Sequence, residues 1–322
     1  MSAGQTEAGR TGVCGSTVVE QRHAASFRDV LASGEFIVTM ETTPPKGTDL
    51  EPVLAEAEAC WDRVDAFTVT DNQSSNMSLG ALVLSLRLKE RGLLSVLQMS
   101  CRDRNRLALQ SDLLAGAHLG ITDIMCLTGD HVVMGDHEEA MPVFDLDSVT
   151  LLQVARGLMD GHDMVGNELK GPAPRFTLGA AVSPCSDPLE PQLLKLEKKV
   201  AAGAEFIYTQ AVYDMDRLRS FMDEISHLDV PIMGGFCFLK SARGCQFMND
   251  NLAGVSVPQA LIDRFDKCDT SEARLECSIE ISVELIAGME EACRGVHLMP
   301  LGWERHVPTI LDAAGRSGSH EG

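Results

Sequence analysis

The sequence predicts a single-domain α/β protein, a (β/α)8 or TIM barrel. From residue 34 onward, short apolar and β-branched runs alternate with helical stretches, and eight such units fit into about 280 residues. This number and spacing are typical of a TIM barrel, and regular alternation favours a parallel sheet. The rival architecture, an open doubly wound sheet, typically has a Gly-rich phosphate turn after its first strand. Here the first run ends in Glu41-Thr-Thr-Pro-Pro45, so the barrel is preferred.

The eight apolar runs are expected to be strands, because each is short and is bounded by Gly, Pro or polar residues. Pro44 and Pro45 stop the first run, and Gly129-Asp130 breaks the fourth. The expected strands are 35–41, 66–70, 95–100, 121–128, 175–182, 206–210, 230–236 and 295–300.

The stretches between the runs carry apolar residues at helical spacing and are expected to form the outer layer. Four expected helices cover about 49–61, 146–159, 188–202 and 214–227. Two more end at about 91 and at 118–120, further helices lie within 240–290, and a final helix starts near 303. The domain is expected to cover 28–316, with a flexible N-terminal tail over 1–27 and a C-terminal tail over 317–322.

Composition excludes several function classes. Of 322 residues, 44% are apolar and 23% charged, which is typical of a globular protein with a core. The 27 Lys and Arg against 47 Asp and Glu give a net charge of −20, which disfavours nucleic acid and anionic lipid as partners. No run approaches the roughly 20 apolar residues of a membrane span, and the first 34 residues lack a secretory signal. We therefore expect a cytoplasmic protein.

The cysteines and histidines do not predict a metal centre. The ten cysteines form no C-x-x-C and have no zinc-finger or ferredoxin spacing, so we expect reduced, mostly structural thiols. His131 and His137 lie beside acids in a loop, but no third ligand is evident. No metal site is expected.

Polar residues follow the expected strands, where a TIM barrel builds its active site. They are Glu41, Thr70 with Asp71, Gln98 with Ser100, Thr128-Gly129-Asp130, Ser183 and Gln210, and Phe236 ends the seventh strand. The absence of Lys from these ends disfavours a Schiff-base aldolase. Glu41 and Asp130 are the candidate catalytic acids. Glu41 could instead cap the next turn or pair with Lys46, and Asp130 could cap a helix.

Gln210 ends an apolar strand, where a buried amide must find hydrogen-bonding partners. Taken together, these residues predict a site for a polar heterocycle, with an acid available for proton transfer.

Four ordered segments resemble the methylenetetrahydrofolate reductase family. They are Thr39-Met-Glu-Thr-Thr-Pro-Pro45, Leu127-Thr-Gly-Asp130, Val200-Ala-Ala-Gly-Ala-Glu-Phe-Ile-Tyr-Thr-Gln210, and Tyr213-Asp214. The resemblance runs from about 28 to 315. Gln98-Met-Ser-Cys-Arg-Asp-Arg-Asn-Arg106 and the segment from Leu239 to Pro258 are more similar to reductases of acetogen-like bacteria than to the enterobacterial type.

The resemblance implies a flavin-dependent reduction of 5,10-methylenetetrahydrofolate to 5-methyltetrahydrofolate with NAD(P)H, in one-carbon metabolism and methionine biosynthesis. It implies that Glu41 is the general acid for ring opening, with a pKa raised by burial, and that Asp130 stabilises the cationic iminium and tunes the flavin. Gln210, Phe236 and Leu301 would bind the folate. The implied cofactor contacts are Thr70, Gln98, Thr128, Gly129, Asp130 and Ala181, with Lys199 and its neighbours Lys195 and Lys198 on the phosphates. The implied cofactor is FAD, with FMN possible.

This chain also departs from the enterobacterial pattern. Gln98 replaces a His, Phe236 or Phe238 must replace a stacking aromatic residue, and the segment 182–190 at the flavin-phosphate end is shorter. We expect a homo-oligomer. One alternative is a folate-binding subunit of an electron-transfer complex, which receives electrons from an iron–sulfur partner. The other is a methyl-transfer barrel without NAD(P)H activity. The sequence does not distinguish NADH from NADPH.

Overall fold

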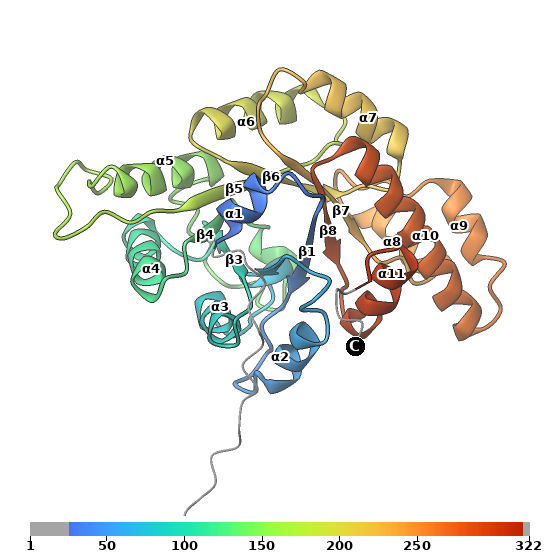
Figure 1. The fold of residues 1–322 in the computed structure, drawn as a ribbon. Helices are drawn as coiled ribbons and strands as arrows, with labels where there is room; N and C mark the ends of the chain where they lie inside the picture. Colours follow the sequence, from blue (N-terminus) through green and yellow to red (C-terminus); the bar gives the residue numbers. More distant parts are fainter. Residues whose placement is uncertain (1–25, 318–322) are drawn as a thin grey trace, which may run out of the picture.

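The computed structural model describes residues 26–317, and within this range eight parallel strands close into one barrel. Each strand pairs with the next along the chain, and β1 pairs with β8 through Ile37 opposite Gly295 (Figure 1). The predicted single-domain barrel is confirmed. The strands are β1 (Ile37–Thr42), β2 (Ala66–Val69), β3 (Ser95–Ser100), β4 (Asp123–Leu127), β5 (Thr177–Val182), β6 (Phe206–Ala211), β7 (Ile232–Cys237) and β8 (Gly295–Met299).

Helices surround the strands (Figure 1). They are α1 (Phe27–Ala32), α2 (Glu51–Glu58), α3 (Ala81–Glu90), α4 (Arg106–Leu119), α5 (Ser148–Met159), α6 (Glu190–Ala201), α7 (Met215–Glu224), α8 (Ala242–Asn251), α9 (Gln259–Phe265), α10 (Ser271–Ala292) and α11 (Val307–Ala313), with 3-10 turns η1 (Gln73–Ser75), η2 (Val132–Met134) and η3 (Glu304–His306). Local chemistry sets several ends. The side chains of Asn105 and Asp147 accept backbone N–H groups at the starts of α4 and α5, and Gly120 ends α4 with φ 71°.

Helix α1 closes the amino end of the barrel. Phe27 is fully buried and meets the ring of Phe206 edge-on at 4.9 Å, while its backbone N–H donates to the carboxylate of Asp123 over 3.3 Å. Ser26 caps the helix. The predicted N-terminal tail therefore extended two residues too far, because Ser26 and Phe27 belong to the barrel. The rest of that tail, residues 1–25, and residues 318–322 lie outside the described part of the chain.

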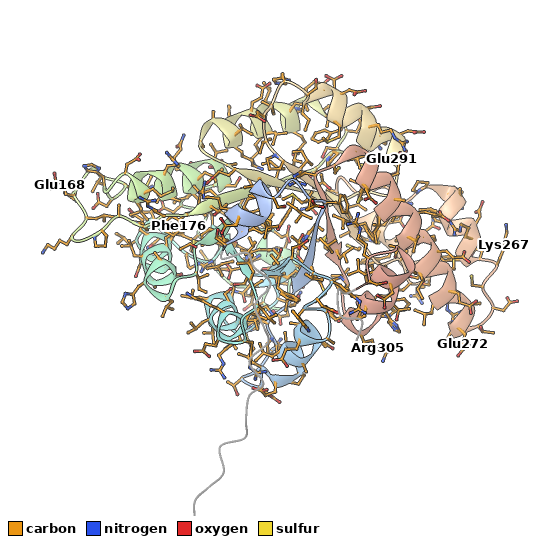
Figure 2. The ribbon with its side chains drawn as sticks, in the orientation of Figure 1. Glu168, Phe176, Lys267, Glu272, Glu291 and Arg305 are labelled. Atoms are coloured by element: carbon orange, nitrogen blue, oxygen red, sulfur yellow. The ribbon has the colours of Figure 1, made fainter. Side chains whose placement is uncertain are left out.

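The loop between α5 and β5 projects outward from the barrel. Figure 2 shows Glu168 at its outer tip, whereas Phe176, at its end, is fully buried against the strands. The loop therefore extends away from the strands.

The barrel interior has an apolar layer at the amino end and a polar layer above it. Ile37, Phe206 and Met233 belong to the first, together with Phe27. In the polar layer the rings of Tyr208 and His297 stack at 4.4 Å with an interplanar angle of 2°. The hydroxyl of Thr39 lies 3.0 Å from Nδ1 of His297.

Burial lowers the pKa of His297 to about 3, so this imidazole is neutral in the folded protein. The unfolded chain takes up the proton below pH 6.5, which the folded protein does not do until about pH 3. This histidine therefore contributes a loss of stability as pH falls from 6.5 towards 3, of about 1.4 kcal/mol per pH unit. His297→Phe keeps a ring against Tyr208 but cannot be protonated.

We expect urea unfolding between pH 6.5 and 4 to show a shallower loss of stability in His297→Phe than in the unsubstituted protein. The exposed His118 provides the control, since His118→Gln should keep the original slope. Equal slopes in all three proteins would contradict a buried neutral imidazole.

Candidate active site

The candidate site lies at the carboxyl ends of the strands. Side chains alternate along a strand, so every second residue points into the barrel. Counting along each strand from its interior residues identifies those at the mouth. These interior residues include Ile37, Ala66, Val96, Phe206, Met233 and His297. They are Glu41, Thr70, Gln98, Ser100, Ala181, Gln210, Cys237 and Met299.

Glu41 is the buried acid of this site. Its side chain is 8% exposed, and each carboxylate oxygen accepts an amide N–H: Oε2 from Gln73 at 2.7 Å and Oε1 from Gln98 at 3.4 Å. Burial raises the pKa of Glu41 to about 7, the two amides partly oppose that shift, and the charge of Glu304 adds to it. A carboxyl with this pKa can donate a proton near neutral pH.

The alternative in which Glu41 pairs with Lys46 is wrong. Lys46 forms an ion pair with Asp136, which also accepts the backbone N–H of Met77. Glu41 is instead a buried acid at the mouth whose hydrogen-bond partners are two amides.

Gln73 was not among the residues singled out from the sequence, although Asp71 in the same turn was. Asn72 and Ser74 adopt left-handed backbone conformations, with φ of 47° and 50°. Thr43 donates to Oε1 of Gln73 over 3.0 Å, which orients its amide N–H₂ towards Glu41.

Asp130 lies in an exposed turn at the rim. It does not cap a helix, because the N-cap of the following turn, η2, is His131. Gly129 before it has φ 92°, and a Cβ there would lie 2.4 Å from Oγ of Ser100. Only glycine fits this position, so the turn presents Asp130 at the rim beside β3.

The other expected cofactor residues divide into two groups. Thr70 has a buried hydroxyl without a hydrogen-bond partner within 26–317, so it is available to a ligand at the mouth. Thr128 instead accepts the N–H of Ser148 over 3.2 Å and so helps to begin α5. Lys199 is buried and donates to the carbonyl of Ala181. Thr128 and Lys199 are therefore part of the scaffold, and Lys199 is not positioned to contact phosphate.

Of the two strand residues expected to bind folate, one lies at the mouth and the other does not. Gln210 reaches the mouth, but it is exposed, so the expectation of a buried amide was wrong. Phe236 is fully buried in the core between strands and helices, near Phe238 at 5.8 Å. It cannot line the mouth, because the neighbouring residues Gly235 and Cys237 are the ones that point inward.

Leu301 and Lys240 form a second part of the rim, between β7 and β8. Leu301 is 49% exposed and has a φ of 50°, and its carbonyl accepts a hydrogen bond from Lys240. The ammonium of Lys240 also lies 5.2 Å from the centre of the Trp303 ring. Lys240 was not singled out from the sequence, since its position depends on contacts between two loops.

A cavity of about 570 Å³ lies between α5 and α6. Its lining includes the first turn of α5, which begins beside the end of β4 through the contact of Ser148 with Thr128. Lys195 and Lys198 line it, so these two lysines, rather than Lys199, are positioned for an anionic group. The lining residues are Asp147, Val149, Thr150, Gln153, Pro191, Leu194, Lys195 and Lys198.

The described residues contain neither a metal-binding cluster nor a membrane-spanning helix. Between residues 26 and 317, no three His, Cys, Asp or Glu side chains are grouped so that they could hold a metal ion. No helix in the same range has the length and apolar character needed to cross a membrane.

Comparison with known proteins gives a family match over most of the chain. The sequence model described as "Methylenetetrahydrofolate reductase" matches residues 26–315. Among curated proteins, methylenetetrahydrofolate reductase 2 of Schizosaccharomyces pombe is 24% identical over 303 residues, which cover 89% of this chain and 46% of that protein. Methylenetetrahydrofolate reductase 1 of the same yeast is 22% identical over 227 residues, which cover 68% of this chain and 35% of that protein. The chain thus spans less than half the length of these relatives.

Solved structures share the fold at low sequence identity. A Clostridium thermocellum protein that binds two copies of 5-methyl-5,6,7,8-tetrahydrofolic acid has a TM-score of 0.59 and 15% identity, over 89% of this chain and 96% of that one. EDTA monooxygenase (EmoA) from Chelativorans sp. BNC1 has a TM-score of 0.54 and 13% identity, with the same coverage.

Proposed function

Because the chain belongs to the methylenetetrahydrofolate reductase family, we propose that it reduces 5,10-methylenetetrahydrofolate to 5-methyltetrahydrofolate. The observation that carries this proposal is Glu41, a buried carboxyl with a pKa raised to about 7 at the mouth of the barrel. A structural neighbour that binds 5-methyltetrahydrofolic acid supports a folate as the ligand of this mouth.

Glu41 is suited to the acid-dependent step of this reaction. Opening the five-membered ring of the substrate requires a proton on the nitrogen that leaves, and a carboxyl with a pKa near the working pH is an efficient donor. Gln73 and Gln98 hold both carboxylate oxygens, so the acid is oriented before the substrate arrives. Opening the ring produces a cationic iminium, which the carboxylate of Asp130 at the rim would stabilise.

The residues at the mouth also fit a flavin. The buried hydroxyl of Thr70 without a partner in the described chain and the amide of Gln98 offer hydrogen bonds to a planar heterocycle. When bound, reduced flavin supplies the hydride that the methylene carbon receives. We propose FAD as the cofactor, with FMN as its shorter alternative, and place its phosphate end towards Lys195 and Lys198.

The two lysines give a direct test of that placement. Lys195→Ala combined with Lys198→Ala should weaken flavin binding by about 10- to 100-fold, because two charge-assisted contacts to phosphate are lost. Equilibrium titration of the apoprotein with FAD and with FMN measures the effect. Lys267→Ala is the matched control, since Figure 2 shows Lys267 at the far edge of the molecule, beyond α9. Unchanged affinity in the double variant would contradict this placement.

The proposed electron donor is NAD(P)H, and the decisive experiment uses the purified protein under anaerobic conditions. Bound flavin should lose its visible absorption on addition of NADH or NADPH. Subsequent 5,10-methylenetetrahydrofolate should restore it with formation of 5-methyltetrahydrofolate. In another outcome, neither nucleotide reduces the flavin, but a chemical reductant reduces it and the folate then reoxidises it. This result would indicate a subunit that receives its electrons from a partner protein. A protein that neither binds flavin nor turns over the folate would overturn the proposal.

A further inference from the structure

The segment Cys101-Arg-Asp-Arg-Asn105 follows β3 directly, and the proposed reaction assigns no role to its two arginines. Arg102 is 1% exposed, which is unusual for a side chain that is always charged. A buried guanidinium persists only where its N–H groups find acceptors. Its partners therefore show what it holds in place.

The guanidinium of Arg102 connects two turns at the mouth. Its Nε and Nη2 each donate to a carboxylate oxygen of the neighbouring Asp103 over 2.8 Å. Nη2 also donates to the carbonyl of Asn72 over 2.9 Å, and Nη1 to the carbonyl of Asp130 over 3.3 Å. One rigid, planar group thus binds the backbone of the turn after β2 and of the turn after β4.

The first of these turns carries the partner of the acid. Gln73 follows Asn72 directly and donates to Glu41 over 2.7 Å. Asn72 is in the left-handed region with φ 47°, and its side chain donates to Asp103, the same carboxylate that Arg102 binds. The conformation that points Gln73 at Glu41 is therefore one that a free chain rarely adopts, and Arg102 with Asp103 holds it.

We propose that Arg102 is a positioning residue for both acids: it holds Gln73 on Glu41 through Asn72, and it fixes the turn that presents Asp130. Lysine cannot replace it, because a single ammonium cannot reach three acceptors in the plane of a guanidinium. The inference rests on the proposed function only for its catalytic consequence, since the geometry can be tested without substrate.

The test without substrate measures the pKa of Glu41 by ¹³C NMR of glutamate-labelled protein, with Glu41→Gln to assign the carboxyl signal. The groups that face Glu41 are Gln73, Gln98, Glu304 and Cys237. Arg102→Lys removes none of them, so a change in this pKa reports displacement of the turn.

In Arg102→Lys we expect the pKa of Glu41 to rise, because the donated hydrogen bond of Gln73 favours the charged carboxylate. Gln73→Leu should raise it by a similar amount, and the double variant should raise it no further, since both changes remove the same contact. Additive shifts, or no shift in a folded Arg102→Lys protein, would overturn the inference.

The matched control is Arg106→Lys. Arg106 forms two hydrogen bonds of 2.7 Å with the carboxylate of Asp145, at the start of α4. Within residues 26–317 its side chain donates to neither of the two turns. The pKa of Glu41 should stay unchanged in this variant. If Arg102→Lys does not fold, Asp103→Asn weakens the same link while keeping the arginine, and it should raise the pKa in the same direction.

A second measurement follows turnover. In Arg102→Lys, kcat for folate reduction should fall by about 10- to 100-fold from misplacement of the acid, while Arg106→Lys stays within twofold of the unsubstituted protein. If the unsubstituted protein shows no reductase activity but the NMR shifts appear, the positioning role stands and the proposed function fails. If activity is present and the pKa of Glu41 does not respond, the positioning role fails alone.

Discussion

Replacing Glu41 with glutamine is expected to slow reduction of 5,10-methylenetetrahydrofolate by about 10²- to 10⁴-fold, the range by which a positioned acid accelerates proton transfer. Glutamine keeps the shape of the side chain and can still contact Gln73 and Gln98, but it has no proton to give. Stopped-flow mixing of the reduced protein with the folate measures this step apart from reduction by NAD(P)H, which should change much less.

The pH dependence gives the same assignment independently. A general acid works in its protonated form, so the rate of the folate step should fall as pH rises through about 7, the pKa of Glu41. Glu41→Gln should remove that limb of the profile. Glu304→Gln is the matched control: removing its negative charge should lower the pKa of Glu41 and move the limb to lower pH without abolishing the rate. A Glu41→Gln protein with an unchanged rate and profile would show that Glu41 is not the acid.

Phe27→Ala is expected to reduce the free energy of unfolding by about 3–5 kcal/mol, because it removes a fully buried ring from the amino end of the barrel. The change empties the space against Phe206 and leaves α1 without its main anchor. For a chain of this length, the loss corresponds to a decrease in Tm of roughly 5–10 °C.

Urea unfolding of Phe27→Ala and Phe247→Ala compares the free energy lost when a phenyl ring is removed from a buried and from an exposed position. Phe247 is 60% exposed, so its removal should change stability by less than about 0.5 kcal/mol. Because Phe27 lies at the end of the barrel opposite the mouth, kcat of the folded Phe27→Ala protein should be retained. Equal destabilisation by the two substitutions would contradict the role of α1 as a closure of the barrel.

The barrel was predictable because strand and helix periodicities persist from residue 34 onward, and each expected strand overlaps an observed one. The position of Glu41 at the mouth was predictable for the same reason. It is the last residue of an expected strand, and a TIM barrel builds its active site at the carboxyl ends of its strands. Phe236 shows the limit of this reasoning: the strand was correct, but a shift of one residue reverses the face, and Phe236 belongs to the outer core.

Other parts of the site depend on contacts that periodicity does not encode. Gln73 reaches Glu41 only because neighbouring residues adopt left-handed conformations that Arg102 holds from another loop. Lys199 and Lys198 are neighbours in sequence, yet one donates to a carbonyl of β5 while the other lines a cavity. Adjacent helix positions point in different directions, and only the packing of α6 on the barrel decides which lysine is accessible.

The loops at the mouth form two units that are linked differently. The turns after β1 to β4 are joined to one another through Lys46 with Asp136, Gln73 with Glu41, and Arg102 with Asn72 and Asp130. The loops after β7 and β8 are joined separately, through Lys240 and Leu301. The residues that hold Glu41 by hydrogen bonds and those of the outer rim after β7 and β8 thus lie in different segments of the sequence. The two units still meet at the acid, because the charge of Glu304, which follows β8, raises the pKa of Glu41. Under the proposed function, a change in the second unit would therefore leave the acid unaffected only where it spares Glu304.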